Sequence, residues 1–168
     1  LFFLGCDFEE VPVVLGTLPV LYMLSFKGNK LRHVAETALA PSIGWLILSD
    51  NELRILPRSI GRLKGLRKCM LAGNQLESLP PELALGCREL ELIRLADNKL
   101  LDLPLELLRL PRLAWVALAA NDFNRQAAAE AMGQLETARG DLVVNEGPEG
   151  ILGEGASGVV RSGKLGGE

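Results

Sequence analysis

The chain has 168 residues, of which 48 % are apolar, and a formal net charge of −3 from 18 basic and 21 acidic side chains. This length is enough for one domain with a hydrophobic core. The slight acidic excess argues against a nucleic-acid groove, which needs a surplus of Lys and Arg. No apolar run approaches the roughly 20 residues of a membrane helix. We therefore expect no nucleic-acid partner and no membrane partner.

The chain lacks an initiator methionine and begins inside a repeat, so we expect it to be a fragment. Residues 1–4 are apolar, but Gly5 and Cys6 follow at once, which excludes a signal peptide. The three cysteines are scattered and odd in number, which favours incidental or buried thiols in a reducing compartment. The single histidine, His33, has no ligand-spaced partner, so no metal site is predicted.

A repeat of about 23 residues runs through most of the chain. Each unit contains an asparagine, or a cysteine in the first case, with an apolar residue two places after it. In the five complete units, apolar residues also stand eight, five and three places before the asparagine, as Leu66, Cys69 and Leu71 do before Asn74. The recurring positions are Cys6, Asn29, Asn51, Asn74, Asn98 and Asn121.

The pattern L-x-x-L-x-L-x-x-N-x-L over residues 1 to about 123 resembles the leucine-rich repeat family. Its L-x-L pair alternates with period two, which suits a short parallel strand with one apolar face. The asparagine amide can satisfy backbone groups where the chain turns off the strand. The resemblance implies an α/β solenoid with a curved parallel β-sheet on the concave face and loops or short helical turns on the convex face.

In four of the units an apolar residue and a proline stand five and six residues past the asparagine position, at Val11-Pro12, Leu56-Pro57, Leu79-Pro80 and Leu103-Pro104. Because proline fixes φ and cannot join a strand ladder, these segments are predicted on the convex side. They resemble the intracellular 23-residue type of leucine-rich repeat. The unit after Asn29 departs from it, since Val34 and Ala35 replace the usual Leu-Pro pair. We expect this segment to be irregular and more helical, with Ala38 and Ala40 as its anchors.

In such a repeat, the strand residues between the buried leucines point into the concave face. Apolar patches rimmed by charge often bind proteins, and Trp and Arg are common energetic hot spots. An alternative remains open, in which the two tryptophans lie along the sheet and touch no partner. No catalytic set of side chains is present. The predicted partner-binding residues are Met23, Trp45, Ile47, Lys68, Met70, Leu92, Arg94 and Trp115.

The register ends after Asn121, and the composition changes. Residues 125–136 place alanines and Met132 on one side of a helix and polar residues on the other, which suits a helix that closes the last coil. We therefore divide the chain into a repeat array at 1–123, a helical C-terminal cap at 124–140, and a third segment at 141–168.

Glycine dominates this third segment, and its pattern was compared with three phosphate-binding motifs. A Walker loop needs Lys where Val159 stands, and a Rossmann fingerprint needs a helix where the residues favour a strand. The motif G-x-G-x-x-G-x-V fits, and it resembles the glycine-rich loop of a protein kinase. The alternative is a flexible glycine-rich tail. The resemblance implies nucleotide contacts by Leu152, Gly153, Gly155, Ser157, Gly158 and Val160.

Residues 141–168 are thus predicted to be a linker and the start of a truncated protein kinase domain. The lysine, H-R-D and D-F-G motifs of kinases are absent, so this chain cannot transfer phosphate and has no cofactor of its own. The parent would use ATP and Mg. Because residues 123–151 contain no apolar span, we expect a cytoplasmic, monomeric protein whose repeats recruit a substrate or regulator. The alternative function is a non-catalytic scaffold with an incidental glycine-rich tail.

Overall fold

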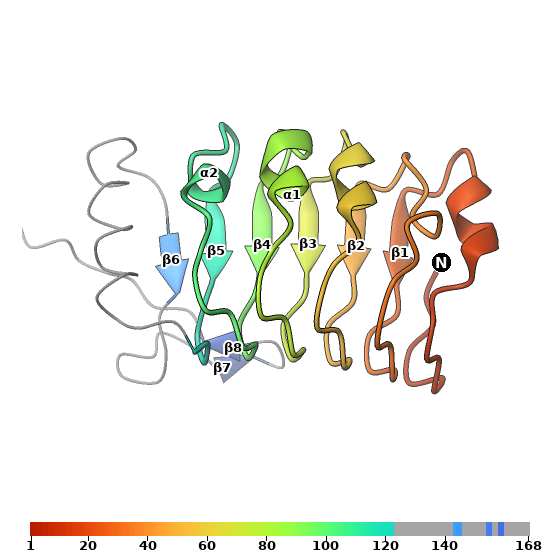
Figure 1. Cartoon of the computed structure of the whole chain (residues 1–168), viewed down its shortest axis with the longest axis horizontal. Coiled ribbons are helices and arrows are strands. Elements are labelled where there is room, and N and C mark those ends of the chain that lie inside the picture. The colour runs from red at the N-terminus through yellow and green to blue at the C-terminus, as the bar shows by residue number, and fades with distance from the viewer. Residues whose placement is uncertain (123–142, 146–153, 156–157, 160–168) are drawn as a thin grey trace, which may run out of the picture.

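The computed structural model describes residues 1–122, 143–145, 154–155 and 158–159. The chain winds into stacked coils, and successive coils add strands to one parallel sheet along the molecule (Figure 1). The predicted solenoid with a parallel sheet is therefore confirmed. The strands, in sheet order, are β1 (Met23–Ser25), β2 (Trp45–Ile47), β3 (Lys68–Met70), β4 (Leu92–Arg94), β5 (Trp115–Ala117) and β6 (Val143–Asn145).

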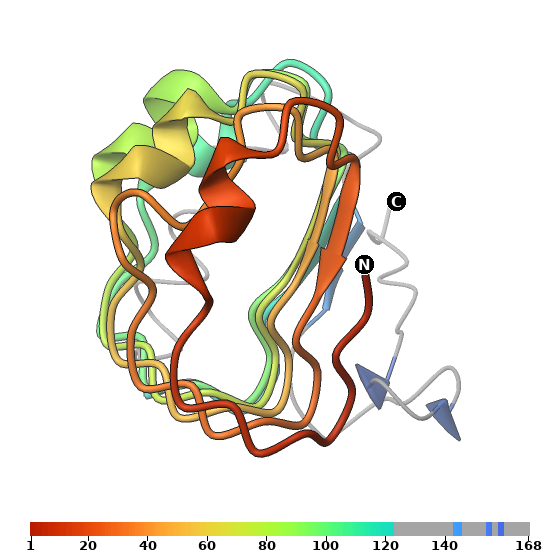
Figure 2. The same cartoon turned by 90° about the vertical axis from the view of Figure 1, so that its right-hand side faces the viewer.

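In four of the coils a short helical turn lies on the side opposite the sheet, as Figure 2 shows. Each begins directly after a proline, whose fixed φ and missing N–H suit the first turn of a helix. The predicted convex side is confirmed. The four turns are η1 (Val13–Thr17), η2 (Arg58–Arg62), α1 (Pro81–Gly86) and α2 (Leu105–Leu108), after Pro12, Pro57, Pro80 and Pro104.

The coil after Asn29 is irregular, as predicted, but the added helicity expected there is wrong. Residues 34–42 form turns and bends without a helix. Ala38 and Ala40 are fully buried and anchor this segment. Without the proline that starts a helix in the other coils, nothing fixes φ at this point of the coil. Small side chains then let the backbone itself approach the core.

The core is one continuous apolar cluster that runs the length of the array. In β2, β3 and β4 the central residues Leu46, Cys69 and Ile93 are fully buried, while their neighbours are partly exposed. Burial raises the pKa of the Cys69 thiol, and it raises that of Cys87 to about 12. Both thiols therefore stay protonated and unreactive at neutral pH, whereas Cys6 is exposed.

The predicted asparagine ladder is present. The backbone N–H of Leu53 donates to Asn74 Oδ1 at 3.1 Å, and Asn74 Nδ2 donates to the carbonyl oxygens of Leu48 and Leu71, each at 2.9 Å. Each asparagine thus satisfies backbone groups of its own coil and of the coil before it. The same bonds recur at Asn51 and Asn98.

The residue directly before each recurring asparagine, or before Cys6 in the first unit, adopts a left-handed backbone conformation. The repeat pattern did not predict this conformation. Its φ lies between +55° and +68° in every coil. Glycine adopts this region without strain, and aspartate tolerates it better than most residues. The chain follows this preference except at the last position, where it has alanine. The six residues are Gly5, Gly28, Asp50, Gly73, Asp97 and Ala120.

The sheet continues past the predicted end of the array. β6 pairs in parallel with β5, with Val143 opposite Trp115 and Asn145 opposite Ala117. These three residues belong to the segment that the sequence assigned to a linker, because their spacing from β5 does not follow the repeat. The helical cap predicted at 124–140 lies outside the described residues.

Substituting Asn74→Ala should lower the free energy of unfolding by about 2–3 kcal/mol, because one buried N–H and two buried carbonyls lose their partner. Asn121→Ala is the matched control. Asn121 makes equivalent bonds but is partly exposed, so water can replace the amide, and a loss of about 1 kcal/mol is expected. Urea unfolding followed by tryptophan fluorescence measures both. Equal losses would contradict the burial argument.

Candidate functional site

The strand register arranges the predicted concave residues in two adjacent rows. Strand partners are aligned one to one from β1 to β5, so each residue lies beside the equivalent residue of the next coil. This matches the concave positions expected from the repeat. The first row is Met23, Trp45, Lys68, Leu92 and Trp115, and the second is Ser25, Ile47, Met70, Arg94 and Ala117.

All the residues predicted to bind a partner are partly exposed in the structure. The two ends of the second row are buried, unlike its centre, because Ser25 and Ala117 are only 1 % and 5 % exposed. The accessible part of this row is therefore its centre, at Ile47, Met70 and Arg94. The face is continuous across β2, β3 and β4, and it is mostly apolar with basic side chains between.

The two tryptophans have different surroundings. The ammonium group of Lys68 lies over the Trp45 ring, 3.9 Å from the ring centre, so the neighbouring coil already holds that ring through a cation–π interaction. Within the described residues, Trp115 has no such ring contact. Trp45 thus agrees in part with the alternative in which the ring lies along the sheet. Trp115 offers a less engaged surface.

A line of four residues, one from each of four successive coils, borders the rows at the start of the strands. Tyr22, Gly44, Arg67 and Glu91 occupy equivalent repeat positions, seven before each asparagine. A side chain on Gly44 would collide with the Tyr22 ring, at 2.2 Å, so glycine lets that ring lie across the coil toward Arg67. Arg67 donates to Glu91 Oε1 from Nη2 (2.7 Å) and Nε (2.9 Å). Glu91, and then Tyr22, raise the pKa of Arg67.

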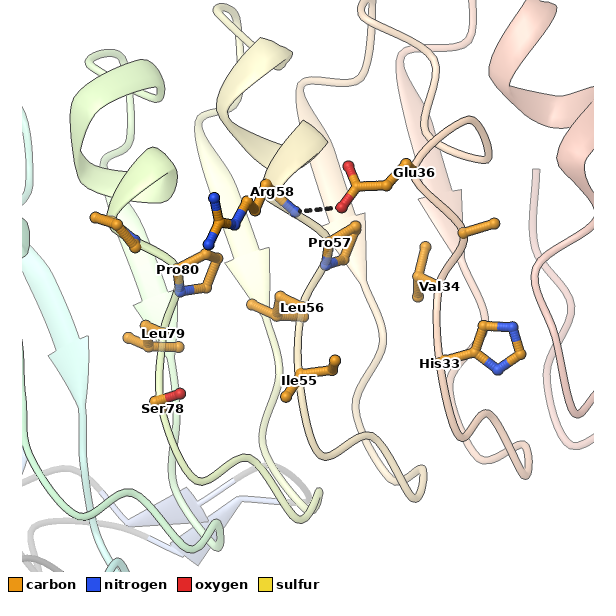
Figure 3. Close-up of a pocket in the computed structure, with 12 residues that line it drawn as sticks. His33, Val34, Glu36, Ile55, Leu56, Pro57, Arg58, Ser78, Leu79 and Pro80 are labelled. Atoms are coloured by element: carbon orange, nitrogen blue, oxygen red, sulfur yellow. Dashed lines mark hydrogen bonds between the residues drawn. The ribbon is translucent and has the colours of Figure 1, made fainter.

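A second concave feature lies on the flank of the coils, away from the strand rows. It is an open groove of about 580 Å³ between three consecutive coils (Figure 3). Its base is apolar, with Val34, Leu56 and Leu79 buried. No sequence pattern marked this groove, since the residues that line it are ordinary convex anchors and prolines. The lining segments are 33–36, 55–58 and 78–81.

Glu36 forms part of the groove wall and links two coils. Its carboxylate accepts a hydrogen bond from the backbone N–H of Arg58 at 2.9 Å (Figure 3). It accepts a second one from the backbone N–H of Ser59 at 2.7 Å, also at the start of η2. The bond from Ser59 is the main cause that lowers the pKa of this carboxyl. Glu36 thus has a structural role in the groove wall, and no nucleophile with an activating base lies among the residues that line the groove. Among the described residues, no His, Cys, Asp or Glu group could hold a metal ion.

Only part of the predicted nucleotide site lies within the described residues. Gly155 is in β7 (Glu154–Gly155) and Gly158 is in β8 (Gly158–Val159), and these two strands pair antiparallel with the two glycines opposite each other. Leu152, Gly153, Ser157 and Val160 lie outside the described residues. The nucleotide contacts therefore stay a prediction.

Known proteins resemble this chain over its repeats. No protein-family model matches it. Chaoptin of Drosophila melanogaster is 33 % identical over 111 residues, which are 64 % of this chain and 8 % of chaoptin. The human volume-regulated anion channel subunit LRRC8E is 32 % identical over 84 residues, which are 48 % of this chain and 11 % of that subunit. The chain thus spans only about a tenth of these relatives.

Solved structures share the fold. A leucine-rich repeat protein of Leptospira interrogans superposes with a TM-score of 0.75 at 28 % identity, over 83 % of this chain and 34 % of that one. The plant peptide hormone receptor RGFR1, in complex with RGF2, gives a TM-score of 0.66 at 22 % identity, over 86 % of this chain and 23 % of the receptor. In the described part of the chain, no helix is long and apolar enough to cross a membrane.

The Glu36 bonds predict a pH-dependent contribution to stability. The pKa of the Glu36 carboxyl is lower in the folded chain than its ordinary value of 4.5. The ionised carboxylate therefore stabilises the fold fully at pH values above 4.5, and this contribution is lost as the pH falls through the lowered pKa of the folded state. Glu36→Gln should therefore reduce stability at pH 7 by about 0.5–1 kcal/mol, because Gln keeps one acceptor oxygen for the η2 amides but loses the second acceptor and the negative charge. Below pH 4.5 the difference from the wild type should shrink.

Urea unfolding at pH 7 and at pH 3 measures this difference. Glu77→Gln is the control, because Glu77 is exposed and no side-chain ion pair of it is present among the described residues. A Glu36→Gln difference that stays constant between the two pH values would show that the charge of Glu36 does not act through the η2 amides.

Proposed function

We propose that this leucine-rich repeat chain acts as a protein-recognition module whose concave strand rows bind a partner. The observation that carries this proposal is the continuous, partly exposed surface formed by the two rows, from Met23 to Trp115. Its residue types, with Trp, Met and Arg among aliphatic side chains, are those enriched at protein interfaces.

The shape of this surface favours an extended protein segment over a small molecule. It is a sheet face, whereas small-molecule sites are usually enclosed pockets. Trp45 and Trp115 lie three strands apart in one row, which corresponds to roughly 14 Å at the usual strand spacing. About four residues of an extended peptide would span that distance.

We also propose that the repeats belong to a cytoplasmic, monomeric protein kinase and recruit its substrate or regulator. The support is the glycine motif at 153–160, together with the antiparallel pairing of Gly155 with Gly158, which a glycine-rich loop between two strands requires. In that parent, ATP and Mg would bind at the glycine-rich loop. The alternative is a non-catalytic repeat scaffold in which this motif has no nucleotide.

Trp45→Ala and Trp115→Ala test the binding surface. Each should reduce the amount of partner captured from a cell lysate about tenfold, because each removes a large apolar contact from the row. The larger effect is expected for Trp115, since Lys68 already covers the Trp45 ring. Capture on the immobilised chain with quantitative mass spectrometry gives the measurement.

Leu85→Ala is the matched control for these variants. Leu85 is 69 % exposed on α1, on the convex side, so its removal should leave capture unchanged. Circular dichroism verifies that all three variants fold. If both tryptophan variants are folded and capture the same proteins as the wild type, the concave rows are not the binding surface.

The kinase proposal has its own test in the gene. The reading frame that contains residue 168 should encode an A-x-K strand within about 25 residues downstream, followed by H-R-D and D-F-G motifs. Sequencing of the full transcript gives the answer. A frame without these motifs would favour the non-catalytic scaffold and would leave the proposed binding surface unaffected.

A further inference from the structure

Charge is distributed unevenly over the molecule, and the concave face has no acidic side chain in its described rows. The chain as a whole has more acidic residues than basic ones, 21 against 18. The strand rows nevertheless contain Lys68 and Arg94, and a third row beside them adds Lys27. The other members of this third row are Ser49, Ala72, Ala96 and Ala119.

Six of the twelve other Lys and Arg residues in the described array pair with a carboxylate of a neighbouring coil. Lys30 pairs with Asp7 at 2.8 Å, and Arg112 pairs with Glu89 at 2.7 Å. Lys27 is also paired, since its Nζ lies 3.6 Å from Asp50. Each such pair removes a site at which an external anion could bind.

Lys68 and Arg94 have no carboxylate partner within the described residues, and they differ in burial from the six other cations there that form no ion pair: those six are exposed, whereas Lys68 and Arg94 are partly buried. The Lys68 ammonium group instead lies over the Trp45 ring, and Arg94 lies between Met70 and Ala117 in the second row. Both side chains are partly buried among apolar neighbours. A charge-assisted hydrogen bond to a carboxylate is stronger in such surroundings than in open water.

We infer that the partner segment on this face is an acidic, extended peptide with two carboxylates about two residues apart and apolar residues beside them. This inference rests on the proposed binding function. Lys68 and Arg94 lie on adjacent strands, two positions apart along them, so their Cα atoms are separated by roughly 8 Å at standard strand geometry. Side chains two residues apart in an extended peptide lie on one face, at roughly 7 Å.

The neighbours of the two cations explain why the segment would also be apolar. Leu92 lies beside Lys68, and Met70 lies beside Arg94, while Trp115 extends the first row past Leu92. The planar guanidinium of Arg94 can bind a carboxylate with two parallel hydrogen bonds. A nucleic acid fits less well, because it requires a stripe of many cations, and this face offers two that are unpaired.

The test is selection of peptides from a random displayed library on the immobilised full chain. The selected peptides should be enriched in Asp and Glu at two positions separated by one residue. Because the chain has only two tryptophans and both lie in the first row, intrinsic fluorescence reports binding at this face directly. The dissociation constant should rise with ionic strength, as screening predicts.

Variants identify the cations. Arg94→Gln should weaken the selected peptides about tenfold, which corresponds to roughly 1.4 kcal/mol. Arg109→Gln is the matched control, since Arg109 is exposed at the end of α2 on the convex side and should have no effect. The double variant Lys68→Glu, Arg94→Glu should instead select peptides with Lys and Arg at the same spacing.

Three results would overturn the inference, and they can be told apart. Selected peptides that depend on Trp115 but show no acidic enrichment would refute the acidic partner and leave the binding function intact. Failure to obtain any peptide that Trp45→Ala or Trp115→Ala weakens would refute both. A single-stranded oligonucleotide that binds as tightly as the best peptide, and that Arg94→Gln weakens, would assign the cations to nucleic acid.

Discussion

The asparagine ladder is the interaction on which the rest of this structure depends. Where each coil leaves its strand, backbone N–H and C=O groups become buried without a strand partner, and such groups are costly unless they are bonded. One amide, such as that of Asn74, satisfies groups from two successive coils. Since every asparagine repeats this arrangement, neighbouring coils stack in one register, and equivalent residues of β1 to β5 fall into straight rows.

The convex side completes this stacking by close backbone contact. A Cβ atom on Gly86 would lie 2.0 Å from the carbonyl oxygen of Gly61, so α1 and η2 approach as closely as they do only because both positions are glycine. The coil that lacks the helix-starting proline is tied in differently, by the Glu36 carboxylate on the first amides of η2. Each coil therefore contacts its neighbours through the sheet, the ladder and the convex turns, as in other solenoids.

In this architecture, charged side chains that pair between coils lie apart from those that could bind a partner. Pairs between coils, such as Arg67 with Glu91, hold the edges of the array. In the strand rows between those edges, Lys68 and Arg94 lie beside apolar side chains and pair with no carboxylate of the described residues. The surface proposed for partner binding is thus set by the same register as the core, because alternate residues of one strand serve the two roles.

The sequence alone determined the features that a single coil encodes. The 23-residue period fixed the solenoid, the asparagine bonds, the proline-started turns and the row assignment of Trp45 and Trp115, because each follows from local periodicity. Contacts between coils were decided only by the tertiary structure. They include the cation–π pair of Lys68 with Trp45, the reach of Tyr22 over Gly44 and the addition of β6 to the sheet. These depend on side-chain directions across stacked coils, which no local pattern specifies.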